Sequence, residues 1–423
     1  MRLSKLVQKQ IKTPSPIRQI MKMAEPRSII AMGLKPENVI SFGGGWVNHR
    51  APAEMQKIYV EICQNSEEFH KSGAYSLTTG SIDCRLQLAR FEEKIFGLKG
   101  LTENNIIIGQ SSTQITRDVL VTVADPADAV LLLDPTYANY AGQIAFALPK
   151  AKIKYLRILD PKTWEYMPDV DDLVEKFKKI YYKTKPKVVI VPSPDNPTGQ
   201  IPKEEFMKAL LDITSDKNTF LAIDSAYKTQ YFSERPPKYY SWSPNEHENL
   251  IALHSNSKWA RGLGRRLGWI EASEDIIGGM ERTQQCTVLC PDTLHQMAIT
   301  AYLKKSLDDN SLKSYLDKAR ADYKKAADVT IKAIDEYLGL PRLTPQGGLY
   351  TVIKVGMDGD EFVMDVLKNT GVLFIPGKGF GESLREGVRL SYGPWVDNTS
   401  RIEEGIRKAG EYLQRKSSTI KRP

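Results

Sequence analysis

Seven short apolar runs, separated by longer polar stretches, occupy residues 105–272 and constrain the fold of this chain more than any other feature. Most of the runs are continuous rather than alternating, which is typical of strands buried on both faces of a parallel sheet. Most intervals leave room for a crossover helix, so the pattern predicts an α/β layered domain. The gap between 255 and 266 is too short for a helix, and the last strand is therefore expected to be antiparallel to its neighbour. The runs are NIIIG (105–109), AVLLLD (129–134), KIKYLRI (152–158), KVVIVP (187–192), TFLAID (219–224), LIALHS (250–255) and RLGWIEA (266–272).

After residue 290 the pattern changes to long helical stretches. The segment 312–339 predicts one helix that ends at Gly339, since Pro341 prevents its continuation. GGLYTVIKV, a second helical stretch, VLFIPG and GVRLSYG then predict a small α+β domain.

A chain of 423 residues is too long for one simple hydrophobic core, so two domains are expected. We expect a large domain at 51–300 and a C-terminal small domain at 301–423. Residues 1–50 are expected to be an N-terminal segment that belongs to the small domain.

Charge and composition argue against a nucleic-acid or membrane partner. Lys and Arg total 59 against 51 for Asp and Glu, but the basic residues are scattered. The basic clusters at 176–187 and in the tail RKSSTIKRP are interpreted as a solvated helix face and a frayed end. No stretch has the apolar length that spans a bilayer.

The cysteines indicate a reduced, cytoplasmic environment. They form no CxxC pair, and too few histidines accompany them for a zinc site, so no metal is expected. The basic N-terminus contains no acid before Glu25 but lacks an apolar core, which argues against secretion. The four cysteines are Cys63, Cys84, Cys286 and Cys290.

The motif SNSK at 255–258, followed by GRRLG at 264–268, lies between two predicted strands. Loops at strand carboxyl ends are where α/β sheets bind ligands. Lys258 could attack an aldehyde there, while Arg266 and two serine hydroxyls hold an adjacent phosphate. For this motif alone, an ordinary surface lysine on a glycine-rich turn remains an open alternative.

Two further motifs follow apolar strands. In TFLAIDSAYKTQYF, Asp224 could pair with a pyridinium nitrogen and Tyr227 could hydrogen-bond a ring oxygen, although an aspartate that caps the following turn is equally compatible. In VPSPDNPTGQ, the prolines and glycine preset a turn that presents the Asn196 amide rigidly.

Together and in this order, these motifs resemble the class I and II aminotransferases of pyridoxal-phosphate (PLP) fold type I. The resemblance implies an α/β fold with a mostly parallel seven-stranded sheet between helices, a small α+β domain, and pyridoxal 5'-phosphate as cofactor. Lys258 matches the Schiff-base lysine and Asp224 the pyridinium partner. Asn196 and Tyr227 match the pair that hydrogen-bonds the ring oxygen and lowers the pKa of the Schiff base.

The resemblance also implies the residues that bind the cofactor phosphate. Ser255, Ser257 and Arg266 match phosphate ligands, and Ser112 and Thr113 would meet the phosphate at a helix N-terminus. The family usually has a glycine before the first serine of this loop, whereas this chain reads GQSST, so a register shifted by one residue stays open.

Three residues outside these motifs also match family positions. Tyr137, in DPTY, matches an aromatic ring that stacks on the cofactor, with a core tyrosine as the alternative. Tyr75, in GAYSLTTG, matches a tyrosine that reaches the phosphate of the neighbouring subunit, which implies a homodimer with active sites at the interface. Arg389, in GVRLSYG, matches the arginine that grips the substrate α-carboxylate, whereas Arg385 and Arg401 are expected to be surface residues.

The N-terminal segments TPSPIRQIMK and VISFGGGWVN resemble the kynurenine and 2-aminoadipate aminotransferase branch. This resemblance places residues 1–50 at the substrate entrance. Arg18 would approach the distal end of the substrate, and the backbone at Gly45 would lie near its carboxylate. WVNHR replaces the usual proline-containing turn of this segment.

The expected reaction is a ping-pong transamination that moves the amino group of an L-amino acid to a 2-oxo acid. The donor is expected to be 2-aminoadipate, an aromatic amino acid or one of a broad range of others, and the expected acceptor is 2-oxoglutarate. Lys258 would act as general base and acid. A PLP-dependent β-eliminating lyase or amino-acid cyclase on the same scaffold stays open, because the same residues would serve it. A non-catalytic sensor would need a DNA-binding module, for which the first 100 residues leave no room. A nicotinamide dehydrogenase is set aside because no GxGxxG follows an early strand.

Overall fold

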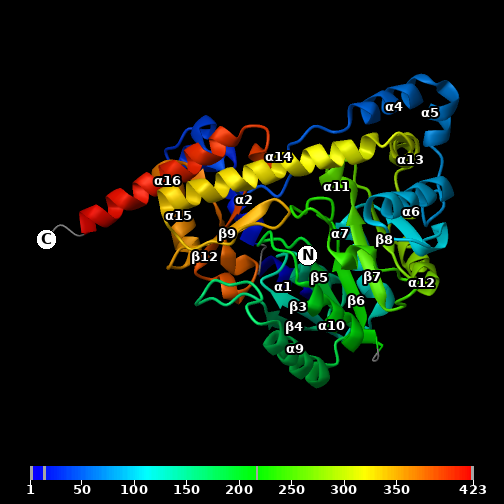
Figure 1. Ribbon diagram of the computed structural model, residues 1–423, viewed down its shortest axis with the longest axis horizontal. Coiled ribbons are helices and arrows are strands. Elements are labelled where there is room, and N and C mark those ends of the chain that lie inside the picture. The colour runs from blue at the N-terminus through cyan, green and yellow to red at the C-terminus, as the bar shows by residue number, and fades with distance from the viewer. Residues whose placement is uncertain (1–2, 13–15, 216–217, 421–423) are drawn as a thin grey trace.

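The computed structural model describes residues 3–12, 16–215 and 218–420 (Figure 1). The seven apolar runs predicted as strands form one seven-stranded sheet, in the order β2-β8-β7-β6-β5-β3-β4. β8 is antiparallel to β7 and β2, as the short gap before it predicts, and the other pairs are parallel. The strands are β2 (Ile106–Gly109), β3 (Ala129–Asp134), β4 (Lys152–Arg157), β5 (Val188–Pro192), β6 (Phe220–Asp224), β7 (Leu250–Ser255) and β8 (Gly268–Glu271).

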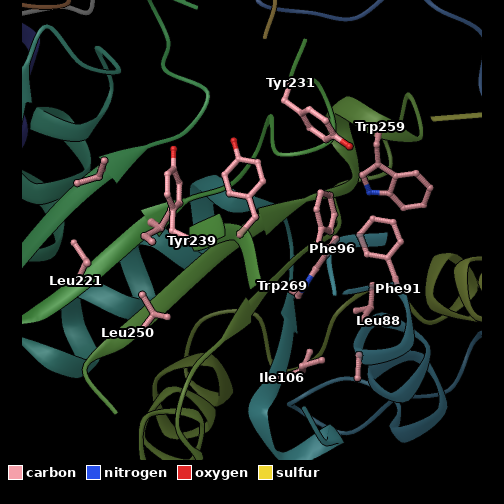
Figure 2. Packing of buried hydrophobic residues seen from close by; sticks show 14 of the residues in the cluster. Leu88, Phe91, Phe96, Ile106, Leu221, Tyr231, Tyr239, Leu250, Trp259 and Trp269 are labelled. Carbon is pink, nitrogen blue, oxygen red and sulfur yellow. The ribbon is translucent and has the colours of Figure 1, made fainter. Parts of the chain in front are cut away.

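Helices cover both faces of this sheet, as the continuous apolar strands require. One face packs against α6 (Ile82–Phe96), α9 (Val170–Thr184), α10 (Glu204–Ser215) and α13 (Thr293–Asp308), and Figure 2 shows part of this aromatic-rich core. The other face packs against α7 (Ser112–Val123), α8 (Tyr140–Ala147) and α12 (Glu274–Gln285).

The edge strand β4 departs from the predicted burial on both faces. Most of its side chains are exposed, including those of Lys152, Lys154 and Arg157. Charged side chains on an edge strand oppose pairing with another chain.

A separate hydrophobic cluster joins the two ends of the chain. Strand β1 (Ile40–Ser41) pairs in parallel with β10 (Val372–Leu373), while β11 (Ile375–Pro376), β12 (Gly387–Ser391) and β9 (Tyr350–Lys354) form an antiparallel sheet. This cluster includes side chains from α14 (Ser311–Ala333), α15 (Gly359–Thr370) and α16 (Thr399–Ile420). The remaining α-helices are α1 (Lys5–Lys12), α2 (Pro16–Met23), α3 (Pro26–Ala31), α4 (Ala53–Gln64), α5 (Ser66–Ser72) and α11 (Asn256–Trp259).

The helix predicted at 312–339 is confirmed, and it passes through a π-helical turn, η4 (Ile334–Leu338), before Gly339 closes it in the left-handed conformation. The basic run at 176–187 lies largely on α9, where Lys176 pairs with Asp172 and Lys178 with Glu175 at the surface.

The prediction of a frayed C-terminal end is wrong for residues 415–420. They continue α16, which extends away from the body of the molecule (Figure 1). In the part of the chain that the structure describes, no helix is both long and apolar enough to cross a membrane.

Candidate active site

A cavity of about 370 Å³ lies between the large sheet, α2 and the sheet that contains β9 and β12. This volume is within the range of roughly 300–1,000 Å³ that is usual for small-molecule sites. Every site residue predicted from the sequence lines this cavity except Tyr75. The predicted site residues that line it are Arg18, Gly45, Ser112, Thr113, Tyr137, Asn196, Asp224, Tyr227, Ser255, Ser257, Lys258, Arg266 and Arg389.

Sheet topology explains why residues so far apart in sequence meet. β5, β6 and β7 are parallel neighbours, so their carboxyl ends lie at one edge. Asp224 ends β6 and Ser255 ends β7, while Asn196 lies in the turn after β5. That turn needs Gly199, which has a φ of +68° and whose added Cβ would lie 2.2 Å from the backbone oxygen of Tyr350.

Lys258 lies on the short helix α11, whose N-cap Ser255 accepts a hydrogen bond from the backbone of Ser257 at 3.2 Å. The Lys258 ammonium donates to the backbone oxygen of Gly45 at 2.6 Å. Burial lowers the pKa of Lys258 to about 8, and the positive charges of Arg389 and Arg266 act in the same direction. A substantial fraction of the amine is therefore neutral, and nucleophilic, near pH 7.5.

The Asp224 carboxylate lines the cavity and has no cationic partner among the described residues. Its oxygens accept from the Tyr140 hydroxyl at 2.6 Å and from the backbone N–H of Ala226 at 3.0 Å. Burial raises its pKa, and within the described residues no cationic group lies within ion-pair distance of it. A buried carboxylate of this kind fits a protonated ring nitrogen, which would supply the missing positive charge.

The predicted phosphate end lies at the N-terminus of the twelve-residue helix α7. Ser112 and Thr113 are its first residues, and the N–H groups of a first helical turn have no acceptor within the helix. Gly268 permits this arrangement, because an added Cβ would lie 2.8 Å from the Ser112 nitrogen. Ser111, the N-cap, and Arg266 both have a positive φ, of 88° and 54°, which is uncommon outside glycine.

Arg389 is 1% exposed, yet no carboxylate pairs with it in the described part of the chain. Its guanidinium donates to Asn196 Oδ1 and to the backbone oxygen of Gly43, both at 2.9 Å. Its Nε has no hydrogen-bond partner among the residues that the structure describes. Because a buried unpaired cation is costly, the site fits a ligand that brings its own carboxylate. Arg385 and Arg401 instead pair with neighbouring glutamates, as expected for surface residues.

Four phenolic side chains, those of Tyr137, Tyr140, Tyr227 and Tyr350, are among the described residues that line the cavity. The hydroxyls of Tyr227 and Tyr350 are 2.6 Å apart. Tyr137 accepts a hydrogen bond from the Asn139 amide at 2.7 Å, and its ring meets that of Tyr140 edge-on. Tyr140 and Tyr350 were not predicted from the sequence, because neither lies in one of the motifs above and each gains its partner only through the tertiary fold.

The predicted substrate side of the cavity is formed by the N-terminal segment. Arg18 is an exposed residue of α2 that lines the cavity together with Met21, Gly45 and Trp46. Tyr75 is 83% exposed and does not reach the cavity of its own chain.

The charges around the cavity favour an anionic ligand. Among the described lining residues, Arg18, Lys258, Arg266 and Arg389 are basic, and Asp224 is the only acidic one. Such an excess of positive charge in a concave site attracts anions.

A second buried polar cluster lies outside the cavity, against the aromatic rings of Trp269 and Phe96. Ligand atoms of Glu92, His254 and Glu271 lie within 4.8 Å of one another, a spacing that could hold a metal ion. The Lys228 ammonium already pairs with Glu92, and the His254 ring stacks on Trp269 at 4.8 Å. The cluster therefore already contains a cation, and we assign no metal to it.

Comparisons with known proteins agree with the fold. A family profile described as aminotransferase class I and II matches residues 40–404. The chain is 23% identical to an aspartate aminotransferase of Pyrococcus horikoshii, over 92% of this chain and 95% of the relative. It is 25% identical to an aromatic-amino-acid aminotransferase 2 of Thermococcus litoralis, over 93% and 96%. A Thermus thermophilus aspartate aminotransferase double mutant superimposes with a TM-score of 0.83 at 21% identity, over 97% of this chain and all of that one. These relatives leave the narrower resemblance to the kynurenine and 2-aminoadipate branch a prediction.

Proposed function

The chain belongs to the class I and II aminotransferases, which are PLP-dependent enzymes, and from this we propose that it moves the amino group of an L-amino acid to 2-oxoglutarate in a ping-pong reaction. The observation that carries the proposal is the buried guanidinium of Arg389, which lines the cavity and pairs with no carboxylate in the described ranges of the chain. Amino acids and 2-oxo acids both carry an α-carboxylate, which would pair with this guanidinium.

The cavity residues fit pyridoxal phosphate at both ends. When bound, the cofactor supplies an aldehyde for covalent attachment and a ring that withdraws electrons from the substrate Cα. Lys258 would hold the aldehyde carbon, and Asp224 would hold the ring nitrogen. Asn196 and Tyr227 would donate to the ring oxygen.

The phosphate would lie at the N-terminus of α7. There the hydroxyls of Ser112, Thr113, Ser255 and Ser257 line the cavity together with Arg266. Helix N-H groups, hydroxyls and a guanidinium form the combination of donors that a phosphate requires. Tyr137 would stack on the ring of the cofactor.

Lys258 would also move the proton. A pKa of about 8 lets its Nζ accept a proton from the substrate Cα and release it again at neutral pH.

Arg389 would bind the substrate α-carboxylate by a two-pronged contact, which the planar guanidinium favours. Its hydrogen bonds to Asn196 and Gly43 fix the plane of the group before the substrate arrives. The backbone at Gly45 would lie near the same carboxylate.

Donor preference would depend on Arg18. If its exposed side chain turns into the cavity, donors with a distal carboxylate, such as 2-aminoadipate, are favoured. If it turns away, aromatic donors fit equally well. The names of the relatives, aspartate and aromatic aminotransferases, support both classes.

We further propose a homodimer in which Tyr75 reaches the phosphate end of the partner's cavity. The support is its exposure of 83%, together with its separation from the cavity of its own chain. A cytoplasmic location remains the expectation from the cysteines.

The test is amino transfer from a panel of L-amino acids to 2-oxoglutarate by the parent, by Arg389→Met and by the surface control Arg385→Met. Loss of a charge-assisted two-pronged contact should lower kcat/KM roughly 100-fold for every donor in Arg389→Met, with no change in the control. Arg18→Ala should lower activity selectively for dicarboxylic donors. Release of pyruvate and sulfide from cysteine without amino transfer would contradict the proposal and favour the β-eliminating lyase.

A further inference from the structure

Tyr350 brings a second phenol to the wall of the cavity. It begins β9 and is 1% exposed, and its hydroxyl lies 2.6 Å from the hydroxyl of Tyr227. The Cζ of Arg389 lies 4.5 Å from the centre of the Tyr350 ring. Tyr350 therefore contacts both a proposed cofactor ligand and the proposed carboxylate ligand.

The position of the Tyr350 hydroxyl is closely confined. The ring packs edge-on against Tyr227, with centroids 5.7 Å apart, and pairing of β9 with β12 places Thr351 opposite Leu390. A Cβ added at Gly45 would lie only 3.1 Å from the same hydroxyl. Tyr350 therefore has little room to point its oxygen elsewhere.

The direction of the hydrogen bond follows from counting protons. A phenol carries one proton and can accept from other donors at its oxygen. Burial raises the pKa of both Tyr227 and Tyr350, so both hydroxyls keep their protons at neutral pH. If Tyr227 donates its proton to the cofactor ring oxygen, the contact between the two tyrosines forms only when Tyr350 is the donor.

We propose that Tyr350 is a positioning residue that donates to the Tyr227 hydroxyl and thereby directs the single proton of Tyr227 toward the ring oxygen of the cofactor. This inference rests on the proposed role of Tyr227. Hydrogen bonds in a chain polarise one another, so the Tyr350 contact makes Tyr227 a stronger donor.

A stronger donor at the ring oxygen has a measurable effect. The ring oxygen can accept a hydrogen bond from Tyr227 or from the protonated nitrogen that would link Lys258 to the cofactor. A stronger hydrogen bond from Tyr227 therefore weakens the hold on the proton of that nitrogen and lowers the pH at which the nitrogen becomes protonated. Removal of the Tyr350 hydroxyl should raise this midpoint by roughly 0.2 to 0.5 pH unit, if the Tyr350 contact strengthens the hydrogen bond from Tyr227 to the ring oxygen by roughly 10–30%.

The experiment is a pH titration of the PLP-loaded enzyme, followed by the absorbance of the bound cofactor, for Tyr350→Phe, Tyr227→Phe and the double variant. Tyr350→Phe should raise the midpoint, and Tyr227→Phe should raise it further. In the double variant, loss of the Tyr350 hydroxyl should add no further shift, because it acts through Tyr227. Tyr392→Phe is the control, since it removes another buried hydroxyl of the same hydrophobic cluster that does not line the cavity.

Each outcome has one meaning. If Tyr350→Phe leaves the midpoint unchanged or lowers it while Tyr227→Phe still raises the midpoint, the inference about Tyr350 is overturned and the proposed role of Tyr227 stands. A lower midpoint would mean that Tyr350 accepts the Tyr227 proton and withholds it from the cofactor. An additional shift in the double variant would assign Tyr350 an effect that bypasses Tyr227, which also overturns the inference. If Tyr227→Phe leaves the midpoint unchanged, the proposed role of Tyr227 fails as well.

Discussion

Replacement of Arg389 and of Asp224 should move the pKa of the Lys258 amine in opposite directions. Burial is the main cause of its low pKa, the positive charges of Arg389 and Arg266 lower it further, and the Asp224 carboxylate opposes them. Arg389→Met removes a cation and should raise the pKa of Lys258. Asp224→Asn removes the anion and should lower it.

The size of the effect follows from the pKa of Lys258. At pH 7.5, an amine with a pKa of about 8 is about one-quarter neutral, whereas at the ordinary value of 10.5 it would be about 0.1% neutral. Because burial is the largest cause, loss of one arginine should raise the pKa by roughly 0.5 to 1 unit. The neutral fraction at pH 7.5 should then fall about three- to eightfold.

The assay is competitive acetylation of the cofactor-free protein at several pH values, with mass spectrometry of the peptide that contains Lys258. Arg385→Met is the matched control, since this arginine pairs with Glu382 at the surface. A parent midpoint near 10.5 would refute the reasoning, as would shifts of the same sign in Arg389→Met and Asp224→Asn.

Three further predictions concern positions around the site. Gly268→Ala should weaken PLP binding in a fluorescence titration by roughly tenfold, because the new Cβ must displace the first turn of α7 that would hold the phosphate; unchanged affinity would contradict this role. Lys228→Met should lower the free energy of unfolding by about 3–5 kcal/mol in urea, because it leaves Glu92 buried without its cation, whereas Lys313→Met on an exposed pair should change it little. Burial raises the pKa of Asp195 to about 7, so between pH 4 and 7 the folded state holds a proton that the unfolded state has lost. The free energy of unfolding should therefore fall as the pH rises through this range, by up to about 1.4 kcal/mol per pH unit. Asp195→Asn should remove this dependence in denaturation curves at several pH values, and a parallel decline in both proteins would contradict it.

The strands were predictable because burial on both faces selects continuous apolar runs, which are visible in the sequence without any alignment. The antiparallel β8 followed from chain length alone, since 255–266 cannot contain a crossover helix. The exposed face of β4 was not predictable in the same way, because its position at the edge of the sheet depends on the order of the strands.

The cavity residues were predictable where they follow strands in recognisable motifs, as Lys258 does. Tyr140 and Tyr350 were not predictable, because their hydrogen bonds join residues that are far apart in the sequence. Tyr140 donates to Asp224, 84 positions away, and Tyr350 contacts Tyr227, 123 positions away. The unpaired state of Arg389 was equally hidden, since a sequence shows the charge but not the absence of its partner.

The proposed function requires covalent attachment of pyridoxal phosphate to Lys258. Purified protein would be saturated with the cofactor, reduced with borohydride, digested and mapped by mass spectrometry. We expect the added mass on Lys258 and its loss in Lys258→Ala, with no label on the buried Lys228. A reduced label on any other lysine, or no stable label at all, would contradict the account.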